Sequence, residues 1–460
     1  MVFSSTVFVF FFLPLCLLLY FVLPGLKAKN LVLLLFSLVF YAWGEPVYII
    51  LMILSILLNY TVGIYMEKIP EWRKGILIAG LIVNLGLLGF FKYYGFAVEI
   101  INRLSGLHLS AHTLPLPIGI SFYTFQALSY VIDLYRGKIG VQKNPLLFGL
   151  YISLFPQLIA GPIVRYSEVE KALGDRTVSF DGLGEGMARF LFGLGKKVLL
   201  ANTLGAVFDR TGLQTGPASV LTAWIGLIAF SLQLYFDFSG YSDMAIGLGK
   251  MLGFDFPENF RMPYASGSIT EFWRRWHMTL GSWFREYVYI PLGGSRAGTR
   301  RQIFNILIVW MLTGLWHGAA WNFVLWGLYY GVLLLLEKLV IFRFKKMPKW
   351  IGHVYTVFLV FLGWGMFLCG SLSEVGQVFT NLFGLGGAAA ADAAGLWLLR
   401  SDGVLLGIGA LFCLPCFLRL REKLMTERRG ALTVVCALLF VLCSAFLVAQ
   451  SYNPFLYFRF

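Results

Sequence analysis

Long apolar runs alternate with short polar connections along almost the whole chain. Two of these runs, 6–26 and 430–449, hold about 20 mostly apolar residues, the length that an α-helix needs to cross a hydrocarbon core of roughly 30 Å. The pattern predicts an all-α, polytopic membrane protein with about 11–12 membrane-spanning helices. The predicted spans are 6–26, 30–43, 47–66, 75–97, 115–135, 186–206, 219–237, 303–317, 319–341, 351–371, 402–418 and 430–449.

The segment 145–163 is apolar but does not fit a simple span. Pro156 and the pair Gly161-Pro162 interrupt any helix there. Broken backbone at membrane depth is tolerated only where protein or a water-filled cavity covers it. If every Lys/Arg cluster lies in the cytoplasm, this segment must enter and leave on one side of the membrane. We therefore expect it to be re-entrant and to border a substrate path.

Composition agrees with a membrane protein and excludes other classes. Of the 460 residues, 58% are hydrophobic and 13% are charged, against roughly 25% charged residues in ordinary soluble domains. The net charge of +14 comes from short Lys/Arg clusters between apolar runs, so it indicates orientation and no nucleic-acid partner. The first lysine is Lys27, so we expect the opening segment to be a retained span. Cys413 and Cys416 have no neighbouring His or Asp, and we expect no metal site.

The stretch EFWRRWHMTLGSWFREYVYIPLGG is polar and aromatic and lies inside the long polar segment 239–302. Such a segment cannot face lipid, so it must line a cavity or lie on the cytoplasmic surface. On a helix, Trp273 and Arg274 would share a face with His277. A surface histidine on a basic interfacial helix is the alternative to a site residue. Three arginines could hold phosphate groups, with Trp276 in an aromatic wall: Arg274, Arg275 and Arg285.

His317 lies in the nearly uncharged stretch VWMLTGLWHGAAWNFVLWGLYYG. An ionisable group at membrane depth is a functional candidate, although a structural bond to a neighbouring helix is the alternative. Gly314 and Gly318 would let another backbone or a narrow ligand come close. A neutral imidazole can accept the proton of a hydroxyl that attacks an activated carbonyl group. The remaining histidines are expected to be solvated or interfacial: His108, His112 and His353.

Several long motifs occur in order along the chain: FYTFQALSYVIDLYRG (122–137), FPQLIAGPIVRY (155–166), LQLYFDFSGYSDMAIGLGKMLGFDFPENFRMPY (232–264), TGLWHGAAWNFVLWGLYYG (313–331) and NPFLYFRF (453–460). Together with the stretch around His277, they resemble the membrane-bound O-acyltransferases over nearly the whole chain. Within that family they are most similar to the branch that serves bacterial polysaccharide O-acetylation.

The resemblance implies one membrane domain over 1–460, a ring of helices around a narrow central tunnel, in the bacterial cytoplasmic (inner) membrane. It also implies acetyl-CoA as a donor substrate arriving from the cytoplasm, with no permanently bound cofactor. His317 matches the near-invariant histidine of the family, and His277 matches its second conserved polar position. Tyr330 stands where relatives often carry a further histidine, so that position is a poor candidate for essential chemistry.

The ending SYNPFLYFRF is either a membrane-surface anchor or part of the reaction. In the related system that D-alanylates teichoic acid, a small companion protein ends in a similar aromatic motif whose tyrosine is proposed to carry the acyl group. By this resemblance, Tyr457 could accept acetyl and present it outside. Its phenol, with an ordinary pKa near 10, would need a base such as His317 to become nucleophilic.

The final acceptor is expected to be an extracytoplasmic polysaccharide. The chain has no GxSxG elbow, so we expect a separate outer transferase of the Ser-His-Asp (SGNH) type to complete the transfer. Peptidoglycan is the favoured acceptor, with an alginate-like or other exopolysaccharide as the alternative. Membrane lipid surrounds the chain. A transporter of lipid or glycan and a scaffold for the outer enzyme are the competing functions.

Overall fold

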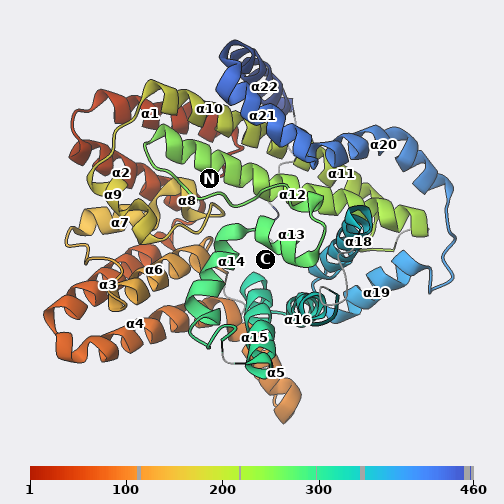
Figure 1. Cartoon of the computed structure of the whole chain (residues 1–460), viewed down its shortest axis with the longest axis horizontal. Coiled ribbons are helices and arrows are strands. Elements are labelled where there is room, and N and C mark those ends of the chain that lie inside the picture. The colour runs from red at the N-terminus through yellow and green to blue at the C-terminus, as the bar shows by residue number, and fades with distance from the viewer. Residues whose placement is uncertain (111–114, 217–218, 297, 342–347, 450–455, 457–460) are drawn as a thin grey trace. The chain divides into compact units, whose positions relative to one another are not determined.

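The computed structural model describes residues 1–110, 115–216, 219–296, 298–341, 348–449 and 456 (Figure 1). These residues are helical almost throughout, and among them the only strand-like pairing is an isolated bridge between Ser219 and Ala389. The all-α class predicted from the sequence is confirmed. Contacts divide the chain into two compact units: Met1–Phe190 with Tyr241–Pro257, and Leu191–Gly240 with Glu258–Phe460.

The first unit consists of the N-terminal helices and two helix ends. Its elements are η1 (Phe8–Phe12), α1 (Leu13–Val22), α2 (Leu26–Gly44), α3 (Ile49–Lys68), η2 (Pro70–Trp72), α4 (Arg73–Leu88), η3 (Gly89–Tyr93), α5 (Tyr94–Ser105), α6 (Ile120–Tyr135), α7 (Pro145–Ser153), α8 (Phe155–Leu158), α9 (Tyr166–Gly174), the start of α10 (Phe180–Gly195) and the end of α12 (Val220–Met251). Helices α3, α4 and α6 lie side by side. The side-chain amides of Asn59 and Asn84 bond each other in both directions, at 3.0 and 2.8 Å, so these buried polar groups join α3 to α4.

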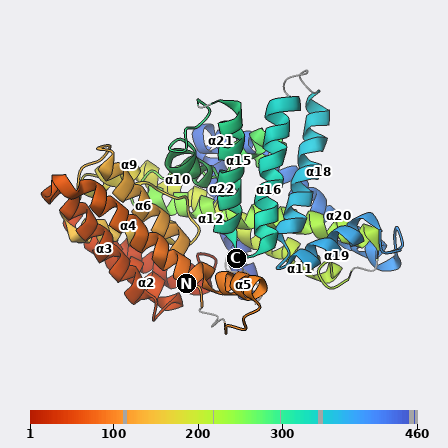
Figure 2. The ribbon, with the colours of Figure 1, turned by 90° about the horizontal axis from the view of Figure 1, so that it is seen from below.

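The second unit holds the remaining helices. They are the end of α10, η4 (Lys196–Ala201), α11 (Asn202–Thr211), most of α12, η5 (Pro263–Ala265), α13 (Ile269–Arg275), α14 (Met278–Phe284), η6 (Arg285–Tyr289), α15 (Thr299–His317), α16 (Trp321–Leu336), η7 (Glu337–Ile341), α18 (Lys349–Phe367), α19 (Leu372–Phe383), α20 (Ala393–Phe412), α21 (Pro415–Glu427) and α22 (Arg429–Ala449). Helices α15, α16 and α18 stand side by side in both views (Figure 1, Figure 2).

Glycines bring α15 and α16 into backbone contact just before His317. A Cβ atom added at Gly314 would lie 2.1 Å from the carbonyl oxygen of Phe323, and one added at Gly327 would lie 2.2 Å from that of Trp310. Real Cβ atoms do not approach so closely, so these positions need glycine. The close approach predicted from the small residues around His317 is therefore confirmed.

Nine helices in the described part of the chain are long and apolar enough to cross a membrane, fewer than the 11–12 predicted. The missing spans are helical but shorter or more polar. Segment 6–26 yields the short apolar helix Phe8–Val22, and 115–135 yields the 16 residues of α6. Segment 303–317 is the apolar part of α15, whose first turn contains two arginines.

Two of the predicted spans have wrong boundaries. The span predicted at 402–418 is α20, which begins at Ala393 because the Asp392 side chain accepts from the Gly395 N–H, and which ends at Phe412, shortly before Pro415. The span predicted to end at residue 237 continues to Met251 as α12. Its aspartates, Asp237 and Asp243, are buried and therefore do not face lipid.

The predicted break in 145–163 is present. Helix α7 ends at Ser153, α8 covers only Phe155–Leu158, and the residues that follow through Val164 are buried. Protein therefore covers the broken backbone, as membrane depth requires. Re-entry on one side of the membrane stays a prediction.

Candidate active site

His277 lies outside any helix, between α13 and α14, with φ 45° and ψ 53°. The predicted helical face shared by Trp273, Arg274 and His277 is therefore wrong. The physical reason is Asn259, whose backbone oxygen accepts from the Met278 N–H at 3.0 Å and so fixes the turn. A left-handed conformation is unusual for a non-glycine residue, and such strain tends to persist at functional sites.

The same asparagine determines the tautomer of His277. Asn259 Oδ1 accepts from the backbone N–H of Thr279 at 3.3 Å and from its hydroxyl at 2.9 Å, which identifies this atom as the oxygen. His277 Nδ1 lies 3.1 Å from the same oxygen and must therefore carry the proton. Nε2 is left with its lone pair, and it is buried with no hydrogen-bond partner among the described residues.

Burial also determines the charge of His277, which lies outside the candidate membrane-spanning helices in the sequence. The ring is 2% exposed and packs edge-on against Phe238, with ring centroids 4.8 Å apart. Loss of solvation lowers the pKa of His277 to about 3. The imidazole is therefore neutral at physiological pH, and its Nε2 is suited to accept a hydrogen bond.

His317 is the last residue of α15, directly before the turn to α16. Its ring is packed edge-on by three aromatic rings at centroid distances of 5.0 to 5.2 Å: Trp316, Trp326 and Phe367. Trp316 also contacts the ring of His277, at 5.8 Å, so one indole touches both histidines. This arrangement fixes both imidazoles in a largely apolar environment.

Both histidines line a single cavity of about 160 Å³ in the second unit. The other lining residues are Trp273, Trp276, Leu280, Gly281, Phe284, Arg285, Tyr289, Ile306, Val309, Trp310 and Thr313. The two imidazoles, separated by forty positions in sequence, are thus brought to one apolar chamber with an arginine in its lining.

The predicted phosphate-binding residues divide into two groups. Arg285 is exposed and lines the cavity, as does the buried Trp276. Arg274 is exposed on α13, and Arg275 bonds Glu271 one turn earlier on that helix. Neither Arg274 nor Arg275 is part of the cavity lining.

Tyr330 has a structural position. It is fully buried on α16, its hydroxyl donates to the Val360 carbonyl at 3.4 Å, and its ring contacts Trp273 at 4.7 Å. A Cβ atom at Gly363 would lie 2.2 Å from that hydroxyl, so α18 is shaped around the tyrosine. Of the other histidines, His108 is exposed, His353 Nδ1 lies 3.4 Å from the Ser266 carbonyl, and His112 lies outside the described residues.

Sequence reasoning missed a buried ion pair between two candidate membrane-spanning helices. Lys197 Nζ lies 2.7 Å from Asp237 Oδ1, and the two side chains are 3% and 2% exposed. Asp237 Oδ2 accepts the backbone N–H of Leu456 at 2.9 Å. A lone aspartate inside the apolar run around LQLYFDF was the signal available. Tyr457, the predicted acyl carrier, lies outside the described residues, as does the rest of 450–460 apart from Leu456.

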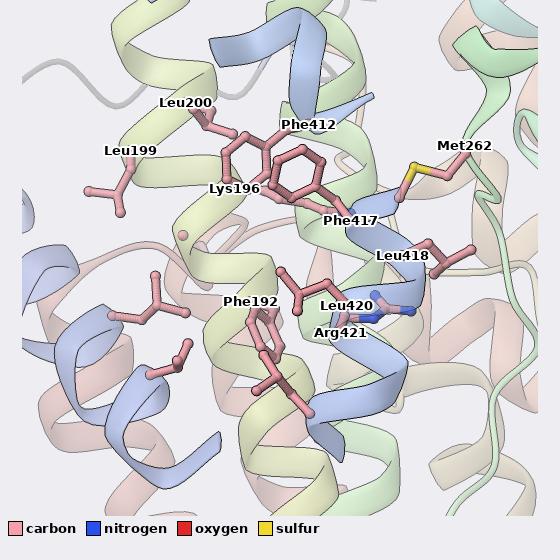
Figure 3. A pocket seen from close by; sticks show the side chains of 14 residues that line it. Phe192, Lys196, Leu199, Leu200, Met262, Phe412, Phe417, Leu418, Leu420 and Arg421 are labelled. Carbon is pink, nitrogen blue, oxygen red and sulfur yellow. The ribbon is translucent and has the colours of Figure 1, made fainter. Parts of the chain in front are cut away.

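A larger cavity of about 370 Å³ lies elsewhere in the second unit, with side chains from α20, α21 and α22 around it (Figure 3). Its lining is apolar except for Lys196 and Arg421. Neither His277 nor His317 borders it. The smaller, histidine-lined cavity is therefore the candidate active site.

Comparison with known proteins agrees with this geometry. The model of the membrane-bound O-acyltransferase family (MBOAT) matches residues 139–373, which include both histidines. A probable alginate O-acetylase of Pseudomonas putida is 39% identical over all of both chains, and one of Pseudomonas syringae pv. tomato is 43% identical over 84% of this chain and 76% of its own. A peptidoglycan O-acetyltransferase of Helicobacter pylori is 36% identical over 85% of this chain and 81% of its own. The chain thus belongs to the membrane-bound O-acyltransferase family and is a multi-pass O-acyltransferase.

Proposed function

We propose that this protein takes acetyl from cytoplasmic acetyl-CoA and passes it across the bacterial inner membrane for O-acetylation of an extracytoplasmic polysaccharide. The observation that carries the proposal is the pair of buried histidines, His277 and His317, lining one small apolar cavity. The names of the similar proteins, which are O-acetylases and O-acetyltransferases, support acetyl as the transferred group.

His317 is the general base in this proposal. The acceptor hydroxyl oxygen attacks the carbonyl carbon of the thioester while His317 accepts the hydroxyl proton. A tetrahedral oxyanion forms, the C–S bond then breaks, and the departing sulfur takes the proton from His317. The products are the acetyl ester and free CoA thiol, and the imidazole returns to its neutral form.

His277 has a different role in this scheme, because burial holds its pKa near 3 and makes it a weak base. Its Nε2 lone pair is suited to accept a hydrogen bond from an amide N–H of the donor's pantetheine arm. Such a bond would hold the thioester within reach of His317. A buried acceptor that has no partner among the described residues is best satisfied by a ligand.

The cavity volume limits what it can enclose. At about 160 Å³ it is smaller than the roughly 300–1,000 Å³ of pockets that enclose drug-sized ligands. It suits the acetyl thioester, while the nucleotide would remain at the mouth. In this proposal Arg285, which is exposed and borders the cavity, binds the phosphates of the nucleotide, with Trp276 as an aromatic wall.

Tyr457 is the proposed first acceptor, from which an outer transferase of the SGNH type would move acetyl to the polysaccharide. A membrane-surface anchor is the alternative role for the tail. Labelled acetyl-CoA distinguishes the two: mass spectrometry of the C-terminal peptide should find acetyl on Tyr457. An unlabelled tyrosine together with full activity of Tyr457→Phe would exclude the relay.

The relatives bear on which polysaccharide accepts the acetyl group. Relatives named for alginate show 39% and 43% identity, against 36% for the one named for peptidoglycan. We therefore place an alginate-like exopolysaccharide ahead of peptidoglycan, reversing the order expected from the sequence alone. Ester-linked acetate measured separately in secreted polysaccharide and in cell wall of a deletion strain decides between them: the fraction that loses acetate identifies the acceptor.

The proposed chemistry is tested with purified protein. His317→Ala should abolish thiol release from acetyl-CoA and acetate transfer in cells, whereas His353→Ala, a matched change on α18, should leave both intact. A transporter of finished glycan would release no thiol, and a scaffold would tolerate loss of either histidine. Thiol release and acetylation by a folded His317→Ala protein would contradict the assignment.

A further inference from the structure

The pair formed by Lys197 and Asp237 has no part in the acyl transfer described above, yet it brings two charges to membrane depth. Lys197 belongs to the candidate span Phe180–Thr211 and Asp237 to Val220–Met251. A buried ion pair is weak evidence for stability, because removal of both charges from water offsets most of their attraction. Polar residues inside membrane spans are instead retained chiefly for function.

The local backbone is adapted to this pair. Lys197 lies in the π-helical segment η4, and π-helical turns within helices are frequent at functional sites. A Cβ atom added at Gly240, one turn after Asp237, would lie 2.8 Å from the Gly193 carbonyl oxygen. The two helices therefore approach each other closely beside the pair.

The two carboxylate oxygens of Asp237 have different partners. Oδ1 receives Lys197 at 2.7 Å, and Oδ2 accepts the N–H of Leu456 at 2.9 Å. Leu456 is itself 3% exposed, so this bond is shielded from water. A hydrogen bond to an ionised acceptor is among the stronger ones in proteins.

A second buried aspartate on the same helix provides a comparison. Arg189 Nε and Nη2 each lie 2.6 Å from Asp243 Oδ1. Both residues belong to the first unit. The Asp243 carboxylate is thus held by an arginine, whereas the Asp237 carboxylate is held by a lysine and by a main-chain N–H.

We propose that Lys197 and Asp237 form a docking site that holds the C-terminal tail at Leu456. The lysine keeps the carboxylate ionised and oriented, and the free oxygen binds the backbone N–H, so the site recognises the main chain. Leu456 directly precedes Tyr457 in the sequence. This role rests on the proposed function: if Tyr457 accepts acetyl, Lys197 and Asp237 are positioning residues for it.

The docking is tested by hydrogen–deuterium exchange of the purified full-length protein in detergent. The double variant Lys197→Met/Asp237→Leu removes both charges and leaves neither partner buried alone. Exchange in peptides covering 450–460 should become faster by about tenfold or more, the factor expected for losing a hydrogen bond to a charged group. The control variant Asn59→Leu/Asn84→Leu removes a buried polar pair of the first unit, and it should leave exchange in these peptides unchanged.

A second variant leaves the ion pair intact. Leu456→Pro removes the N–H that Asp237 accepts, and the other amides of the tail should exchange faster, as they do in the double variant. Wild-type exchange rates in both Lys197→Met/Asp237→Leu and Leu456→Pro would overturn the docking site.

Failure of the docking site can be told apart from failure of the relay. If docking positions Tyr457, Lys197→Met/Asp237→Leu and Leu456→Pro should both lose acetyl labelling of Tyr457, while the Asn59→Leu/Asn84→Leu control retains it. Absence of label in the wild-type protein would refute the tyrosine relay and leave the exchange result to decide docking. Faster exchange with undiminished labelling would refute the positioning role.

Discussion

His277 Nδ1 lies 3.1 Å from Asn259 Oδ1, and this single bond determines that Nε2 is the basic nitrogen of the ring. The two residues are 18 positions apart in sequence. The asparagine therefore acts on the proposed chemistry through the histidine, without itself lining the cavity.

Replacing Asn259 with Leu should reduce thiol release from acetyl-CoA by about fivefold, because the ring loses the acceptor that selects its tautomer, a bond worth roughly 1 kcal/mol. The measurement is the initial rate at saturating acetyl-CoA. Thr279→Val removes another donor to the same oxygen and leaves the His277 bond in place, so it should lower thermal stability more than rate. Equal rate losses in the two variants would show that Asn259 serves folding alone.

The charge of His277 makes a prediction about pH. Its pKa is about 3 in the folded protein, against an ordinary value near 6.5, so between these values the unfolded chain binds the extra proton. Stability contributed by the neutral ring is fully present above about pH 6.5 and is lost as pH falls toward 3, at up to about 1.4 kcal/mol per pH unit. The thermal midpoint in detergent should therefore fall less steeply with acid for His277→Gln than for wild type. Parallel curves for the two proteins would contradict this.

Arg285 and Arg274 offer a matched pair, since both are exposed and only Arg285 lines the cavity. Arg285→Gln should raise the KM for acetyl-CoA about tenfold, as expected for one lost hydrogen bond to a charged group, with little change in kcat. Arg274→Gln should leave KM near the wild-type value. With S-acetylpantetheine, a donor that lacks the nucleotide phosphates, the two variants should behave alike. A persistent defect of Arg285→Gln with that donor would exclude phosphate binding.

The glycine contact between α15 and α16 should be intolerant of a methyl group. Gly314→Ala forces a Cβ atom against the Phe323 carbonyl, so we expect a loss of about 1–3 kcal/mol in stability and reduced activity through displacement of His317. Gly407→Ala, on α20 with no atom within 4 Å of its Cβ, should be tolerated. Thermal midpoints and thiol release of the two variants make the comparison. A stable, active Gly314→Ala protein would show that α15 and α16 can move apart without loss of stability or activity.

Local sequence determined that this is a helical membrane protein, and it identified His317, one of the two histidines that line the cavity. Runs of about 20 apolar residues specify membrane helices because only their own length and composition are involved. Pro156 and Pro162 specify the break near α8 for an equally local reason. His317 was identifiable because an ionisable side chain in an apolar run is unusual wherever its partners lie.

Partners distant in sequence decided the rest. His277 lies outside the predicted helix because Asn259 fixes the turn. Helix α12 extends beyond Asp237 because Lys197 and Arg189 form ion pairs with its two aspartates. Leu456 reached Asp237 across 219 positions. The periodicity of a segment records which of its faces is apolar, but it carries no information about which distant residue will neutralise a charge or hold a turn. Only the tertiary structure could therefore assign the tautomer of His277 and the anchor of the tail.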